Sequence, residues 1–86
     1  MKVHVPTQLR SYTGGVALVD ARGDTLSAVT RDLDRQFPGM RFRIIDEQDQ
    51  VRTHIRVFVN GAQALDLETR LAPHDEVRIV GALSGG

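Results

Sequence analysis

The sequence contains no cysteine and has no excess of charge of either sign. Without cysteine the chain cannot form disulfides, thiolate-bound metal sites or a cysteine nucleophile. Eleven Lys and Arg residues balance eleven Asp and Glu residues, whereas a nucleic-acid-binding domain needs a basic excess on one face. We therefore expect no nucleic-acid partner.

The sequence also lacks a long apolar run. No segment approaches the roughly 20 apolar residues that a helix needs to span a bilayer. The residues after Lys2 alternate in polarity instead of forming the apolar segment of a signal peptide. With 86 residues, the chain has the length of one domain with a modest core. We expect a single domain over residues 1–86, located in the cytoplasm and without a membrane partner.

The N-terminal part of the sequence predicts a hairpin. Residues 3–5 alternate between apolar and polar, which is typical of a strand with one buried face. Thr13-Gly14-Gly15 favours a turn, because glycine reaches positive φ angles without steric cost. Residues 16–19 then predict a second strand, so the two strands form a β-hairpin.

A helix is predicted to follow the hairpin, beginning near Leu26 with Asp24 or Thr25 as its N-cap. Pro38-Gly39 ends it. Spacings of three and four residues place four apolar side chains on one face: Leu26, Val29, Leu33 and Phe37. Residues 40–45 are compatible with a short extended piece or a helical turn, and polar residues 46–50 indicate an exposed loop.

The C-terminal half predicts further strands. Residues 55–59 alternate as a strand, Asn60-Gly61 is a strong hairpin signal, and a short strand is expected around residues 63–64. After a turn at residues 73–75, Val77 and Ile79 begin a last strand. Three leucines in the intervening connection are expected to pack against the domain: Leu65, Leu67 and Leu71. This order predicts an α+β fold of the β-grasp kind, with a mixed sheet packed on one main helix.

The sequence ends in Ser84-Gly85-Gly86. At an average glycine usage of about 7%, two terminal glycines have a chance probability of about 0.5%. Two residues without Cβ atoms can lie extended in a narrow channel of another protein. We therefore expect a flexible tail over about residues 83–86, with its carboxylate reachable by a partner's active site.

Five stretches of the sequence resemble the MoaD/ThiS family of ubiquitin-like sulfur carriers. They are Val5-Pro6-Thr7-Gln8-Leu9-Arg10, Tyr12-Thr13-Gly14-Gly15, Gly23-Asp24-Thr25-Leu26, Val57-Phe58-Val59-Asn60 and the terminal Gly85-Gly86. The resemblance spans essentially the whole chain and implies a ubiquitin-like β-grasp fold. The first two stretches look most similar to the carriers that feed cysteine biosynthesis.

The resemblance implies a function without catalytic side chains. In such carriers an adenylating enzyme of the ubiquitin-activating type joins the terminal carboxylate to AMP, and a sulfur donor then displaces the AMP to leave a thiocarboxylate. For this chain, the resemblance implies that Gly86 would bear the thiocarboxylate and that Ser84 and Gly85 would form the slim tail. The carrier would bind no cofactor itself, since the partner enzyme uses the ATP.

Several functions stay open at this point. The sulfur-accepting partner could be a synthase of cysteine biosynthesis or the large subunit of molybdopterin synthase, or the sulfur could enter a secondary metabolite. A protein modifier joined to target lysines through Gly86 is a second class, although Lys2 offers the only lysine for chains of the modifier on itself. A β-grasp interaction module with an inert tail is a third.

The strand pattern also predicts a docking surface. Phe58 should point away from the side of Val57 and Val59, toward the outer face of the sheet. An exposed aromatic side chain is a suitable anchor for a partner. The candidate docking residues are Arg56, Phe58, Arg78, Val80 and Leu83. The alternative is that the connection over residues 65–71 covers Phe58.

Other combinations of polar residues predict no site. The three histidines, His4, His54 and His74, lack the spacing of metal ligands. Gly14-Gly15 lacks the following Lys-Ser/Thr pair of a phosphate-binding loop.

Overall fold

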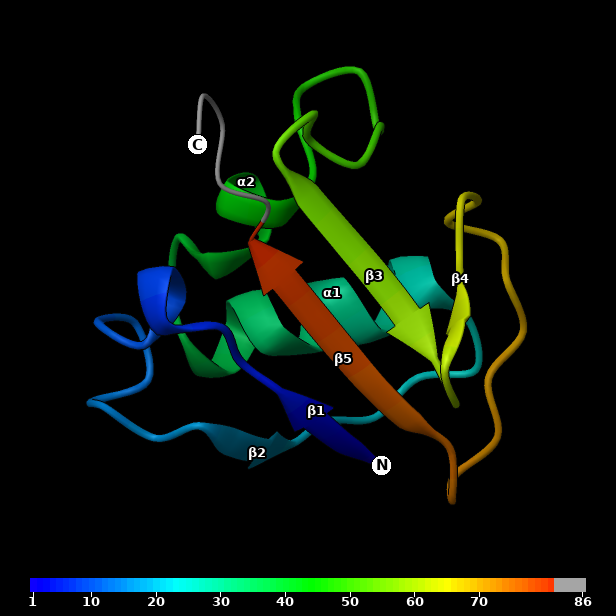
Figure 1. Cartoon of the computed structure of the whole chain (residues 1–86), viewed down its shortest axis with the longest axis horizontal. Helices are drawn as coiled ribbons and strands as arrows, with labels where there is room; N and C mark the ends of the chain where they lie inside the picture. The colour runs from blue at the N-terminus through cyan, green and yellow to red at the C-terminus, as the bar shows by residue number, and fades with distance from the viewer. Residues whose placement is uncertain (82–86) are drawn as a thin grey trace.

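The computed structural model describes residues 1–81, and in it one helix crosses one face of a mixed sheet (Figure 1). The strands are β1 (Lys2–His4), β2 (Leu18–Asp20), β3 (Ile55–Val59), β4 (Ala62–Gln63) and β5 (Glu76–Gly81). The helices are the 3-10 helix η1 (Thr7–Leu9), α1 (Leu26–Gln36) and α2 (Met40–Ile44). The five strands lie in the order β2-β1-β5-β3-β4, with β1 and β5 parallel and the other neighbours antiparallel. This arrangement confirms the predicted α+β β-grasp layout.

The predicted N-terminal hairpin is present, but its second strand begins later than expected. Val16 lies outside β2 and is 48% exposed. Its backbone N–H donates to the carbonyl of Thr13, and its carbonyl accepts a 2.7 Å hydrogen bond from Thr13 Oγ1. The turn therefore uses both backbone groups that Val16 would need for strand pairing. The 3-10 helix η1, which follows Pro6, was not predicted from the sequence.

Helix α1 begins where its cap predicts. Thr25 is the N-cap, and its side-chain oxygen accepts a 3.1 Å hydrogen bond from the backbone N–H of Ala28. Just before the cap, the backbone at Gly23 passes against the first turn of α1. A Cβ atom at Gly23 would lie 2.6 Å from the backbone nitrogen of Val29, so only glycine fits this approach.

The core lies between α1, α2 and one face of the sheet. Leu26, Val29 and Leu33 of α1 are buried, as their spacing predicts, and Phe37 is half-buried. From the strands, the core receives Val3, Ile55, Val57, Val77 and Ile79, and from α2 it receives Met40 and Ile44. Across residues 1–81, every helix falls short of the length and apolar character that a membrane crossing requires.

Residues 40–45, which the sequence left undecided, form α2 and its C-cap. Asp34 Oδ1 accepts hydrogen bonds of 3.1 Å from the backbone N–H groups of Gly39 and Arg41, which stabilise the start of this short helix. Residues 47–50 form the exposed part of the predicted loop.

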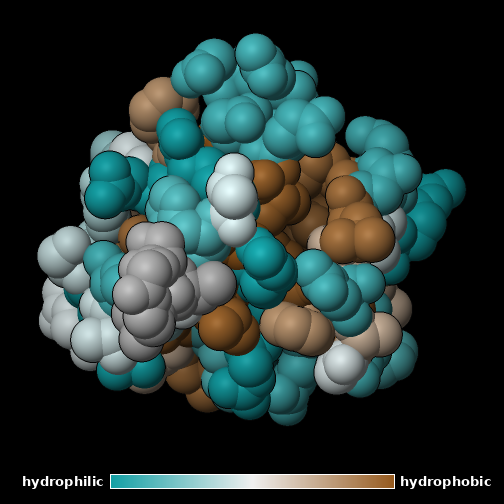
Figure 2. Space-filling model, turned by 45° about the horizontal axis from the view of Figure 1, so that its top comes forward, coloured by the Kyte–Doolittle hydropathy of each residue, from teal (hydrophilic) through white to brown (hydrophobic). Residues whose placement is uncertain are grey.

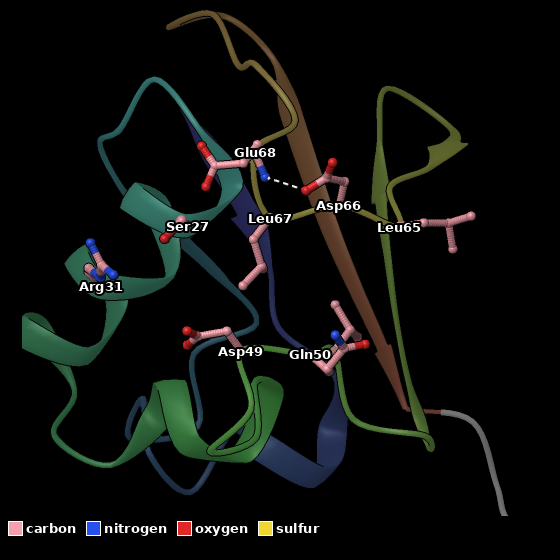
Figure 3. Close-up of a pocket in the computed structure, with 9 residues that line it drawn as sticks. Ser27, Arg31, Asp49, Gln50, Leu65, Asp66, Leu67 and Glu68 are labelled. Carbon is pink, nitrogen blue, oxygen red and sulfur yellow. Dashed lines mark hydrogen bonds between the residues drawn. The ribbon is translucent and has the colours of Figure 1, made fainter.

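One packing prediction for the connection after β4 is wrong. Leu71 is buried and Leu67 is half-buried, but Leu65 is 82% exposed. The extended backbone alternates here, and the inward position belongs to Ala64, whose N–H donates to the carbonyl of Val57. Figure 3 shows the side chain of Leu65 pointing away from that of Leu67.

The turn at Asn60-Gly61 confirms the hairpin signal. Both residues have positive φ angles, 50° and 87°, as a two-residue hairpin turn requires. The side chain of Asn60 also donates a 2.9 Å hydrogen bond to Asp75 in the turn before β5. Hydrogen bonds from the backbone N–H of Ala72 and from Asn60 hold the pKa of Asp75 below its usual range.

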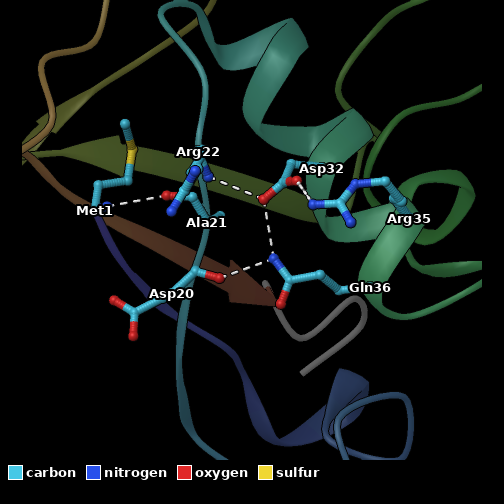
Figure 4. Close-up of polar contacts among 7 residues, drawn as sticks. All are labelled: Met1, Asp20, Ala21, Arg22, Asp32, Arg35 and Gln36. Carbon is cyan, nitrogen blue, oxygen red and sulfur yellow. Dashed lines mark hydrogen bonds and ion pairs between the residues drawn. The ribbon is translucent and has the colours of Figure 1, made fainter.

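A polar cluster joins α1 to the edge strand β2 (Figure 4). Asp32 accepts hydrogen bonds from the side chains of Arg35 and Gln36 and a 2.9 Å bond from the backbone N–H of Arg22. Gln36 also donates a 2.9 Å hydrogen bond to the carbonyl of Asp20. The hydrogen bond from Arg35 and the one from Arg22 keep the pKa of Asp32 below its usual range.

Candidate functional site

The central strand β5 carries the chain toward the predicted tail. Its last residue, Gly81, pairs with Ile55, the first residue of β3. We call the end of the sheet formed by Gly81 and Ile55 the exit end. The predicted tail residues Leu83, Ser84, Gly85 and Gly86 lie outside the described residues.

Gln8 lies against the backbone of Gly81. Its side-chain nitrogen donates a 3.4 Å hydrogen bond to the Gly81 carbonyl. A Cβ atom at Gly81 would collide with the amide group of Gln8, so glycine allows this close approach. The sequence does not predict this contact, because Gln8 belongs to η1 and no local pattern indicates that helix.

The outer face of the sheet brings four of the predicted docking residues together. Phe58 pairs with Arg78 across β3 and β5, and Arg56 pairs with Val80 one step closer to the exit end. Directly opposed residues on neighbouring strands share a face, so these four side chains form one surface. We call this set the outer-face surface. The fifth predicted docking residue, Leu83, lies outside the described residues.

The 65–71 connection does not cover Phe58. The backbone N–H groups of Leu26 and Ser27, at the start of α1, donate to the carbonyls of Thr69 and Leu67. The connection therefore runs along the helix-bearing side of the sheet, and Phe58 is half-buried on the other side.

The two arginines of the outer-face surface differ in their hydrogen bonds within the chain. Arg56 Nη1 donates hydrogen bonds of 2.6 Å and 3.0 Å to the carbonyls of Thr53 and Ile55, so this group turns back along its own strand. Arg78 is exposed, and within residues 1–81 its guanidinium makes no hydrogen bond or ion pair. Arg78 is therefore the more available of the two for a partner.

A groove of about 310 Å³ runs beside β5 on this face and ends at Gly81. Its walls include His4, Pro6, Gln8, Arg10, Arg78 and Val80. Arg10 is held by a 3.0 Å hydrogen bond from its Nε to the carbonyl of Val5. The groove thus connects the outer-face surface with the exit end.

In residues 1–81 the acidic and histidine side chains are dispersed, and side chains of both charge signs line the cavity beside α1. Within residues 1–81, no group of three or more His, Asp or Glu side chains lies close enough to hold a metal ion. A cavity of about 500 Å³ between α1 and the 65–68 segment is lined by both charge signs, including Arg31, Asp49 and Glu68 (Figure 3). On the face that Figure 2 shows, hydrophobic patches lie between hydrophilic side chains.

Comparison with known proteins finds relatives over the whole length. The model of the ThiS family matches residues 3–86. The sulfur carrier protein CysO of Mycobacterium tuberculosis is 37% identical over 89 aligned residues, which cover 98% of this chain and 96% of the relative.

Solved structures agree with this match. A chain of the BexX/CysO complex of Amycolatopsis orientalis superimposes with a TM-score of 0.91 at 31% identity, covering 99% of this chain and 98% of that one. SAMP1 of Haloferax volcanii superimposes with a TM-score of 0.78 at 27% identity, covering 100% of this chain and 98% of that one.

Proposed function

The chain belongs to the ThiS family, and from this we propose that it is a sulfur carrier whose working group is the carboxylate of Gly86. The observation that carries the proposal is the extent of the match. The family model reaches Gly86, and the identity to a protein named as a sulfur carrier covers 98% of the chain. The central position of β5 supports it, because this strand leads from the core to the exit end.

The proposed chemistry begins with activation of the carboxylate. A carboxylate is a poor electrophile because its oxygen is a poor leaving group. An adenylating enzyme of the ubiquitin-activating type joins the carboxylate of Gly86 to the α-phosphate of ATP and releases pyrophosphate. A sulfur donor then attacks the carbonyl carbon, AMP leaves, and Gly86 carries a thiocarboxylate. Positive groups of the partner stabilise the phosphoryl charge during the first step.

The described part of the chain contributes docking to this reaction. Arg78, Phe58 and the groove beside β5 lie on the same face and lead toward Gly81. A partner that binds there holds the C-terminal segment at its own active site, which converts the encounter of carboxylate and nucleotide into a reaction between positioned groups. The carrier acts as a reactant held on a protein, without catalytic side chains of its own.

We propose a synthase of cysteine biosynthesis as the acceptor of the sulfur. The identity to CysO favours it over the large subunit of molybdopterin synthase. The BexX/CysO complex supports the proposal that a second protein binds carriers of this kind. We place the reaction in the cytoplasm, because it consumes ATP.

A protein modifier is the second candidate function. The similarity to SAMP1, a small archaeal modifier protein, is the observation that favours it. Both candidates require activation of Gly86, and they differ in what attacks the activated carbonyl: a sulfur donor in the carrier, a lysine amine of a target protein in the modifier.

Intact-mass spectrometry tests the proposal. The chain is incubated with ATP, the adenylating enzyme of its own organism and a sulfide donor. We expect a mass gain equal to the exchange of one oxygen atom for sulfur. A variant without Gly85 and Gly86 should gain no mass while keeping the melting temperature of the full chain. Covalent attachment to lysines of other proteins, without any sulfur product, would instead establish the modifier.

A further inference from the structure

A second surface, separate from the outer-face surface, lies at the exit end. It is formed by Phe42 and Arg43 of α2 and by Arg52 and His54, which precede β3. We call these four residues the basic pocket; they line a hollow of about 220 Å³. His54 is the neighbour of Ile55, the residue that pairs with Gly81. Figure 1 shows α2 and the end of β5 at the same end of the molecule.

Arg52 is held in place before any partner arrives. Its Nε donates a 2.6 Å hydrogen bond to the carbonyl of Phe42, and its guanidinium carbon lies 4.4 Å from the centre of the Phe42 ring. A guanidinium over an aromatic face is stabilised by the ring's electrons. A side chain fixed in this way loses little further freedom when it binds, so its remaining N–H groups are prepared for a carboxylate.

The positive charge of the basic pocket is not neutralised by nearby carboxylates. Within the part of the chain that the structure describes, the side chain of Arg43 and the Nη atoms of Arg52 make no hydrogen bond or ion pair. In the neighbouring loop, Asp49 pairs with Arg41 at 3.4 Å, and Asp46 accepts backbone N–H groups of Gln48 and Gln50. These two carboxylates are therefore already engaged, and the third acidic residue of the loop, Glu47, makes no ion pair with Arg43 or Arg52 within the described residues.

The exposed ring of Phe42 adds a reason to expect a partner. Phe42 is 56% exposed, which is unusual for a large apolar side chain, and aromatic and arginine residues supply much of the binding energy of protein interfaces. Paired with the two arginines, it suits an acidic segment whose carboxylates reach the guanidinium groups. A net charge of zero for the whole chain conceals this local excess.

From this geometry we propose that the basic pocket binds an acidic segment of the adenylating enzyme. This inference rests on the proposed function. Carrier and modifier both require activation of Gly86, so the activating enzyme is the partner that the two candidates share. An enzyme that takes up the segment after Gly81 must approach the exit end, and the basic pocket flanks that approach.

Steady-state kinetics with the adenylating enzyme of the same organism test this inference. The single variant Arg43→Glu reverses one charge without removing any hydrogen bond found in residues 1–81. The double variant, Arg43→Glu with Arg52→Glu, reverses both arginine charges of the basic pocket. We expect the double variant to raise the KM for the carrier at least tenfold with kcat unchanged, and the single variant to raise it by a smaller factor. Added salt should raise the wild-type KM, because exposed charges are screened.

Arg31→Glu is the matched control, because it makes the same charge change on an exposed residue of α1, away from the exit end (Figure 3). Its KM should stay within twofold of wild type. Arg43→Glu folds without losing a described contact, so an unchanged KM for this variant and for the double variant would overturn the inference. An effect seen only with the sulfur-accepting synthase would also overturn it. If the wild-type chain forms no activated or sulfur-bearing product at all, the proposed function fails first, and this inference fails with it.

Discussion

The two faces of the sheet are built from the same strands but differ in burial. Along β5, Val77 and Ile79 are 1% and 3% exposed on the helix-covered face, whereas Arg78 is exposed on the outer face. The alternation of a strand thus places core residues and candidate docking residues next to each other in sequence. We therefore expect substitutions at adjacent positions of β5 to change stability and the proposed partner binding separately.

Charged groups also differ in whether they have a partner within the chain. Asp32 of α1 accepts hydrogen bonds from Arg22 and Arg35, and on the outer face His4 lies 3.0 Å from Glu76. On the outer face Arg78 has no such partner within the described residues, and at the exit end the same is true of Arg43. Polar groups that are satisfied internally hold elements together, and those that are not remain available to another protein.

The largest expected effect is on the covered face. Ile79→Ala removes a buried side chain between β5 and α1, so we expect the free energy of unfolding to fall by about 2–5 kcal/mol. Val80→Ala, one residue further on, truncates a half-buried side chain of the outer face and should cost less than half as much. Urea unfolding followed by circular dichroism measures both, and equal losses would break the distinction between the two faces.

The next effect is on binding. Phe58→Asp puts a charge at the centre of the outer-face surface, and we expect the Kd for the adenylating enzyme to rise at least tenfold, about 1.4 kcal/mol. The circular dichroism spectrum should stay that of the native fold. Phe58→Leu keeps the position apolar and should change the Kd by a smaller factor. Titration calorimetry measures the Kd, and an unchanged value for Phe58→Asp would remove Phe58 from the docking surface.

Much of the covered face could be predicted because it follows local periodicity. The spacing of Leu26, Val29 and Leu33 predicted the buried side of α1, and the alternation of residues 55–59 predicted β3. The hairpin between β3 and β4 could be predicted from Asn60-Gly61, because few other residue pairs adopt the two positive φ angles of this turn. Alternation alone predicted that Phe58 points to the outer face, whereas its pairing with Arg78 is known only from the register of β3 on β5.

What the sequence could not predict depends on contacts between distant segments. The position of Gln8 on Gly81 requires η1 to lie beside the end of β5, and no local pattern encodes that. The stacking of Arg52 on Phe42 likewise joins residues of α2 and the segment before β3. Apolar character alone predicts that Leu65 packs inward, whereas the hydrogen bond from the backbone N–H of Ala64 to Val57 accompanies an inward Ala64 and an exposed Leu65.

The smallest expected effect concerns the polar cluster that joins α1 to β2. Asp32→Asn replaces a carboxylate that accepts three side-chain and backbone hydrogen bonds with an amide that can accept fewer, so we expect a loss of about 1 kcal/mol at pH 7. The side chain of Asp32 is only 12% exposed, which limits screening by solvent.

The pH dependence separates this cluster from packing. The folded-state pKa of Asp32 is lowered, so its contribution is present above its unfolded pKa of about 3.9 and is lost as the pH falls through the lower folded value. The difference in unfolding free energy between wild type and Asp32→Asn should therefore be full at pH 7 and should shrink below pH ~4. Glu47→Gln, in the exposed loop, is the control and should show no such difference. A gap that stays constant while the carboxylate is protonated would mean that the charge of Asp32 does not stabilise the contact between α1 and β2, and that the loss in Asp32→Asn has another cause.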